Sequence, residues 1–166
     1  MNKELIGPNL SFFDLSSRES LFLPEDVLEG LLVNEKWLSS KFFYDQNGSD
    51  LFQKITEVPE CYLKKAEIEN LDDNLDGISE LVGEDSAPIE FGSGPPLKSR
   101  MLLGVINPSI YMPLDISKES LLGPTKRLAI ELFPPEIKAI CVDYTAAFQL
   151  PFTLEKNAWD VFLVRV

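Results

Sequence analysis

The stretch over residues 87–100 places the strongest constraint on how this chain of 166 residues can fold. A short apolar run there ends in an acid, Gly92 and Gly94 follow, and a helical pattern begins near Leu97. Glycine reaches positive φ without a side-chain clash, so the two residues allow a tight turn and a close approach of the backbone to a ligand. The unpaired N–H groups of the new helix point to the same place. The stretch therefore predicts a strand, a turn and a helix, and the turn either binds a nucleotide-like ligand or simply reverses the chain.

A second apolar run at residues 110–114 ends in Asp115, at about the separation at which α/β nucleotide-binding folds place a ribose-binding acid. From residue 88 onward, strand-like and helix-like patterns alternate. The predicted strands are 88–91, 110–114, 137–142 and 161–166, and the predicted helices are 97–106 and 118–132. This alternation is typical of a parallel sheet with flanking helices. Gly123 and Pro124 predict a break or a later start in the second helix.

The front of the chain follows a different pattern. Residues 1–22 show no sustained period and predict a partly ordered arm, whose paired Phe12 and Phe13 dock on the core. Helical periods then predict a helix from Pro24, a helix capped by Ser49, and an acidic helix or two from Ala66.

The net charge and the residue types of the chain exclude several classes of function. Lys plus Arg number 15 against 27 for Asp plus Glu, and the net charge of -12 repels phosphate backbones and anionic lipid. We therefore expect a small-molecule partner, with no nucleic acid and no membrane. The N-terminus has no signal-peptide pattern and no apolar run approaches spanning length, which favours a cytoplasmic location. The chain has no histidine, and Cys61 and Cys141 lack metal-ligand spacing, so neither a Ser-His or Cys-His pair nor a metal site is predicted.

Several motifs occur in a fixed order over roughly residues 30–151. They are Phe42-Phe-Tyr-Asp45, Gly48-Ser49, Leu51-Phe52, Ile55, Pro59-Glu60, Tyr62, Glu67, Glu90-Phe-Gly-Ser-Gly94, Lys98, Arg100, Tyr111-Met-Pro-Leu-Asp-Ile-Ser117 and Val142-Asp-Tyr144. In this order they resemble the histidine-specific, S-adenosylmethionine-dependent Nα-methyltransferases of ergothioneine biosynthesis. Agreement of several spaced motifs is far more specific than the two glycines alone.

The resemblance implies a Rossmann-like methyltransferase fold with S-adenosylmethionine as the cofactor. The residues that would contact the cofactor are Gly92, Lys98, Asp115, Asp143 and Tyr144. Their chemistry suits these roles: Gly92 lets the backbone approach the amino-acid part, Asp115 can accept both ribose hydroxyls, and Asp143 can accept from the adenine amino group. Lys98 would pair with a carboxylate or cap backbone groups.

The resemblance also implies that Tyr62 and Tyr44 hold the histidine substrate. Residues 1–83 would then form a helical substrate-side segment, and residues 84–166 a partial cofactor-binding domain. Two departures from the family stand out: residues 63–66 replace its usual Pro, Thr and Arg, and family members continue further. We expect a sheet truncated after its fourth strand, with strand 161–166 as an apolar edge that can pair with another chain.

Two functions remain open. The first is an S-adenosylmethionine-dependent methyltransferase that acts on the α-amino group of an amino acid, and the second is a non-catalytic cofactor-binding or interaction fragment. A nicotinamide-dependent oxidoreductase is disfavoured because the turn lacks the third glycine. Most of the family residues that orient the substrate have no counterpart among these 166 residues, and Tyr62 and Tyr44 alone would leave it mobile, so we expect this chain alone to methylate histidine poorly.

Overall fold

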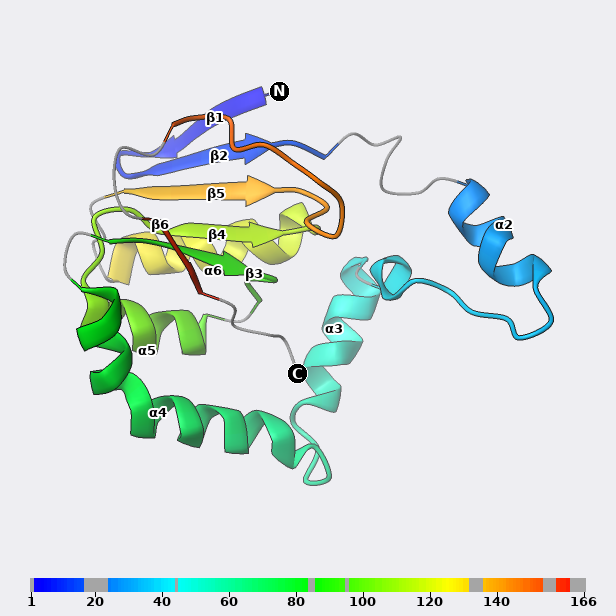
Figure 1. Cartoon of the computed structure of the whole chain (residues 1–166), viewed down its shortest axis with the longest axis horizontal. Coiled ribbons are helices and arrows are strands. Elements are labelled where there is room, and N and C mark those ends of the chain that lie inside the picture. The colour runs from blue at the N-terminus through cyan, green and yellow to red at the C-terminus, as the bar shows by residue number, and fades with distance from the viewer. Residues whose placement is uncertain are drawn as a thin grey trace.

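The computed structural model describes residues 2–16, 24–43, 45–83, 86–94, 96–131, 136–153 and 158–161. Within them, a six-stranded sheet has the strand order β1-β2-β5-β4-β3-β6 (Figure 1). Its strands are β1 (Asn2–Gly7), β2 (Leu10–Asp14), β3 (Ala87–Phe91), β4 (Met112–Asp115), β5 (Ile137–Cys141) and β6 (Ala158–Val161). The helices are α2 (Pro24–Leu32), the 3-10 turn η1 (Ser40–Phe43), α3 (Gln46–Ile55), α4 (Tyr62–Val82), α5 (Leu97–Ile106) and α6 (Lys118–Glu131).

The α/β part of the chain forms the predicted parallel sheet. Strand β3 lies between β4 and β6, β4 also pairs with β5, and all these pairings are parallel. Helices α5 and α6 connect β3 to β4 and β4 to β5, as parallel neighbours require. The predicted α/β class is therefore confirmed. The predicted edge at 161–166 lies mostly outside the described residues, so its pairing with another chain stays a prediction.

At the start of the chain the prediction of a partly ordered arm is wrong. The predicted helical segment over 1–83 likewise does not begin there, because the chain there forms the strands β1 and β2. Strands β1 and β2 form an antiparallel hairpin, and β2 pairs in parallel with β5. The reason is burial: Leu10, Phe12 and Phe13 are at most 4% exposed and complete the core around β5. The two phenylalanines do dock on the core, but as part of the sheet.

Three helices differ in detail from their predictions. Helix α3 is capped by Asp45, whose carboxylate accepts a hydrogen bond of 2.7 Å from the Gly48 N–H, so Ser49 lies inside the helix. Helix α4 is continuous and starts earlier than predicted, at Tyr62. Helix α6 runs through Pro124 without a break. The buried side chains on both sides of this proline, Leu121 and Leu128, anchor α6 to the core and offset the lost backbone hydrogen bond.

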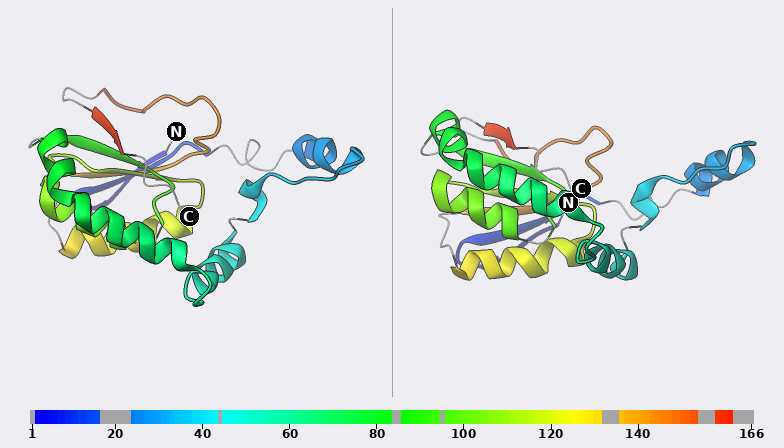
Figure 2. Two further views of the ribbon diagram at one scale, coloured as in Figure 1. Left: turned by 60° about the horizontal axis from the view of Figure 1, so that its bottom comes forward. Right: turned by 90° about the horizontal axis from the view of Figure 1, so that it is seen from below.

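The helices and the sheet form layers. Helices α4, α5 and α6 lie side by side on one face of the sheet, and the segment after β5 lies on the other face (Figure 2). On that second face, Phe148, Leu150 and Phe152 pack against the buried residues of β3, β4 and β5. Helix α4 reaches the sheet through α5, in a cluster built on Leu71 and Leu102.

Helix α2 stands away from the sheet (Figure 1), and the surface around it is unusually apolar. Leu28, Leu32 and Trp37 are 52%, 78% and 50% exposed. Among the described residues, no helix combines the length and the apolar character needed to cross a membrane.

Candidate cofactor-binding site

Three residues predicted for the cofactor gather at one edge of the sheet. Strands β3, β4 and β5 run parallel and in register, so their carboxyl ends meet there. Gly92 follows β3, Asp115 is the last residue of β4, and Asp143 follows β5. Two backbone hydrogen bonds of 2.9 Å hold the strand ends together: Ser93 N–H donates to a β4 carbonyl, and Val142 N–H donates to the carbonyl of Asp115. In open parallel sheets this edge is where ligands bind.

The turn after β3 depends on the backbone conformation of Gly92. Its φ is +69°, in the left-handed region that favours glycine. A Cβ atom at this position would lie 2.9 Å from the hydroxyl oxygen of Tyr144. The Tyr144 ring stands edge-on to Phe91, with 5.6 Å between the ring centroids. Gly92 and Tyr144, predicted to share a site, therefore lie next to each other.

We expect Gly92→Ala to lower both stability and ligand affinity. The left-handed conformation costs a non-glycine residue about 1–2 kcal/mol, and the new methyl group must displace Tyr144. Thermal unfolding measures the first effect. Calorimetric titration with S-adenosylhomocysteine, the demethylated form of the cofactor that the resemblance implies, measures the second. Gly104→Ala is the matched control, because a Cβ there meets no atom within 4 Å and alanine favours the helix. Equal melting temperatures for the two variants would contradict the assigned role of Gly92.

The two aspartates are each oriented by the loop that follows them. Asp115 is only 3% exposed, and its Oδ1 atom accepts a hydrogen bond of 2.9 Å from the Ser117 N–H. Asp143 Oδ1 accepts from the N–H and the hydroxyl of Thr145, at 3.0 and 2.5 Å. These bonds set the direction of both carboxylates. Carboxylate oxygens suit a ligand that donates hydrogen bonds, such as a diol or an amino group.

The buried carboxyl group of Glu90, which the sequence showed only as part of a motif, contacts residues of the glycine turn and around it. Glu90 is 5% exposed and accepts hydrogen bonds from Ser99 Oγ at 2.8 Å and from the Tyr111 hydroxyl. Ser93 of the turn lies 3.5 Å away, at the limit of a hydrogen bond. Burial raises the pKa of Glu90, and the hydrogen bond from Tyr111 opposes that rise. Burial and the nearby Glu90 charge raise the pKa of Tyr111 well above its ordinary value. An acid at the end of a buried strand needs such donors, so the sequence could indicate that Glu90 has hydrogen-bond partners but not which residues they are.

Lys98, in the first turn of α5, pairs with a carboxylate of the protein, and its predicted contact with the cofactor stays a prediction. The partner is Glu67 of α4, whose Oε1 atom is 2.8 Å from the Lys98 ammonium. Both side chains are largely enclosed, with exposures of 18% and 26%. The ion pair therefore joins α4 to the helix that starts at the glycine turn.

Comparison with known proteins shows which family the chain belongs to. The family described as "histidine-specific methyltransferase, SAM-dependent" matches residues 23–163. The chain belongs to this family. It is 34% identical over 128 residues to a histidine N-alpha-methyltransferase of Mycobacterium tuberculosis, and 35% identical over 126 residues to that of Mycolicibacterium smegmatis. These alignments cover 75% and 74% of the chain but 40% and 39% of the relatives.

A more distant relative has a different named substrate. A 4-dimethylallyltryptophan N-methyltransferase of Claviceps purpurea is 27% identical over 110 residues, which are 64% of this chain and 32% of the relative. The chain thus spans about 40% or less of the length of the curated relatives described here. S-adenosylmethionine is the cofactor of the family.

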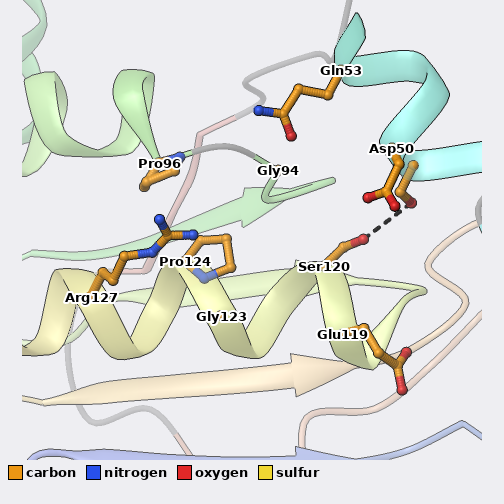
Figure 3. Close-up of a pocket in the computed structure, with 10 residues that line it drawn as sticks. Asp50, Gln53, Gly94, Pro96, Glu119, Ser120, Gly123, Pro124 and Arg127 are labelled. Atoms are coloured by element: carbon orange, nitrogen blue, oxygen red, sulfur yellow. Dashed lines mark hydrogen bonds between the residues drawn. The ribbon is translucent and has the colours of Figure 1, made fainter. Parts of the chain in front are cut away.

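In this histidine-specific methyltransferase family member, a polar cavity of about 290 Å³ adjoins the glycine turn (Figure 3). Its lining residues come from α3, the turn and α6: Ser49, Asp50, Gln53, Gly94, Pro96, Glu119, Ser120, Gly123, Pro124 and Arg127. Ser120 Oγ donates to Ser49 Oγ at 3.2 Å, and the Arg127 side chain points from α6 toward Pro96. The cavity extends the candidate site from the glycine turn to α3, which the sequence did not indicate.

The structure leaves the two predicted substrate residues of this family member untested. Tyr62 is the first residue of α4 and is 68% exposed, so the described part of the chain does not enclose it. Tyr44 lies outside the described residues. An apolar cavity of about 490 Å³ is lined by the neighbours of Tyr44 in sequence and by α3: Ser40, Phe42, Phe43, Asp45, Asn47, Gly48, Leu51, Phe52 and Ile55.

Cys141 ends β5 beside the site but is not a nucleophile. The side chain is buried, and burial raises the pKa of its thiol to about 11. The thiol therefore stays protonated at neutral pH.

Proposed function

We propose that this chain forms the S-adenosylmethionine-binding part of an enzyme that methylates the α-amino group of L-histidine. The observation that carries the proposal is the edge at β3, β4 and β5, where a glycine with φ of +69° adjoins two oriented aspartates. The family and the printed names of the two mycobacterial relatives support histidine as the methyl acceptor.

Each predicted cofactor residue has a role that its surroundings support. Asp115 would bind the two ribose hydroxyls, because it ends the strand next to the glycine turn. Asp143 would accept from the adenine amino group, and Tyr144 would pack beside Gly92 at the amino-acid end. Lys98 would hold the start of α5 in place. Together these roles describe a Rossmann-like cofactor site.

The bound cofactor would supply an electrophilic methyl group on a sulfonium. The chain's own task is to bind and orient the reactants and to exclude water, which can account for a large part of such a rate enhancement. Tyr62 and Tyr44 would hold the acceptor so that the lone pair of its α-nitrogen lies in line with the methyl group. Both precede β3 in the sequence.

The first test is which cofactor binds. Calorimetric titration of the 166-residue chain with S-adenosylhomocysteine should give saturable binding, whereas NAD at the same concentrations should give none. Binding of NAD without binding of S-adenosylhomocysteine would reject the proposal and favour an oxidoreductase.

A second candidate function is a cofactor-binding fragment without catalysis. It is favoured by the exposure of Tyr62, 68%, which leaves the acceptor without an enclosing wall in the described part of the chain. A single-turnover assay with labelled S-adenosylmethionine and histidine separates the two. Transfer of label to histidine supports the enzyme, and binding without transfer supports the fragment.

A further inference from the structure

Helix α4 is fixed to the rest of the protein mainly through its second half. Its apolar contacts with α5 form one cluster, which begins at Leu71 and extends toward Val82. The first half of the helix, residues 62–70, contributes no residue to that cluster. This half carries Tyr62, the predicted substrate residue, so the contacts that place it decide where Tyr62 lies.

Among the described contacts that join this half to other elements are a hydrogen bond of 3.0 Å from the Lys64 ammonium to the Thr56 hydroxyl and the ion pair between Glu67 and Lys98. Of these two, the ion pair is the one that reaches α5. The atoms are 2.8 Å apart and both side chains are largely enclosed. By contrast, Glu69 on the same helix lies 3.7 Å from Lys65, and these two side chains are 65% and 81% exposed. An enclosed pair is screened less by water and salt than an exposed one, and the exposed pair joins two residues of α4 itself. Of the two ion pairs, only the one with Lys98 can therefore help to set the position of the helix.

Lys98 also lies close to the groups beneath the glycine turn. Its charge lowers the pKa of Glu90, in opposition to burial, so the ammonium acts on that carboxylate. Ser99, the next residue, donates to Glu90 at 2.8 Å, and Glu90 in turn lies within reach of Ser93 in the turn. The ion pair to α4 and the hydrogen bonds toward the turn therefore start from two adjacent residues of α5, Lys98 and Ser99.

We propose that Glu67 is a positioning residue, which couples the first half of α4 to the glycine turn through its ion pair with Lys98. The cofactor part of this inference rests on the proposed function. In this arrangement the helix that carries Tyr62 and the turn that receives the cofactor move as one unit. Loss of the Glu67 charge loosens both.

Hydrogen exchange followed by mass spectrometry tests the coupling without any ligand. In Glu67→Gln we expect peptides over residues 62–70 and over the turn at 92–94 to exchange at least about threefold faster, since breaking one enclosed pair raises the population of locally open states. Glu69→Gln, which removes the exposed pair on the same helix, should leave both peptides unchanged. The double variant Glu67→Lys with Lys98→Glu restores an ion pair and should recover part of the protection in both peptides.

Titration with S-adenosylhomocysteine adds the functional readout. We expect Glu67→Gln to bind about three- to tenfold more weakly than the unchanged chain, and Glu69→Gln to bind equally well. Unchanged exchange in Glu67→Gln would overturn the inference, and so would faster exchange confined to residues 62–70 with unchanged affinity. If no variant binds S-adenosylhomocysteine, the proposed function fails, while exchange in the turn still decides the coupling.

Discussion

Replacing Asp115 by alanine is expected to weaken the binding of S-adenosylhomocysteine at least tenfold. Asp115 ends β4 at the ligand edge, is 3% exposed, and has a carboxylate oriented by the Ser117 N–H. A hydrogen bond to a charged group contributes about 1.5–3 kcal/mol, and about 1.4 kcal/mol is a tenfold change in affinity. Calorimetric titration measures the loss directly.

Two further variants separate recognition from local unfolding. Asp115→Asn keeps an oxygen that can accept from Ser117 but loses the charge and one acceptor, so we expect a smaller loss of affinity than in Asp115→Ala. Asp76→Ala removes a carboxylate from the exposed face of α4 and should leave affinity unchanged. Unchanged affinity in Asp115→Ala, with a normal melting curve, would contradict the assignment of this residue to the ribose.

The parallel sheet could be predicted because its signals are local. Each apolar run of the second half is bounded by its own turn or helix start, and alternation of the two periods implies parallel neighbours. The pairing of β2 with β5 could not be predicted from local patterns, because the two strands lie far apart in the chain. The hairpin of β1 and β2 is local, and Pro8 and Asn9 between its strands are a turn signal that could have indicated the hairpin.

Part of the candidate site could likewise be predicted from the sequence, and part could not. Gly92, Asp115 and Asp143 follow strand ends, so the sequence alone could place them at one edge. The contacts of Glu90 with Tyr111 and Ser99 could not be predicted, since they join a strand end to the residue before β4 and to a helix. Tertiary packing creates these contacts, and no local pattern of the sequence specifies them.

Glu90→Ala is expected to reduce the free energy of unfolding by about 2–5 kcal/mol. The variant leaves the hydroxyl groups of Tyr111 and Ser99 buried without their acceptor, and each unsatisfied group costs about 1–3 kcal/mol. Urea unfolding followed by circular dichroism measures the change. Glu80→Ala, at an exposed position of α4, is the control and should stay within about 0.5 kcal/mol of the unchanged chain.

The pH dependence of Glu90→Gln then tests the ionisation of the buried acid. Burial raises the pKa of Glu90 above its ordinary value of 4.5, so the native state favours the protonated acid. The stability that Glu90 contributes is fully present below pH 4.5 and is lost as the pH rises through the raised native pKa. Glutamine does not titrate, so we expect the stability of the unchanged chain relative to Glu90→Gln to be highest in acid and to fall as the pH rises above 4.5. A relative stability that increases with pH would show instead that the hydrogen bonds from Tyr111 and Ser99, together with the Lys98 charge, stabilise the carboxylate more than burial opposes it.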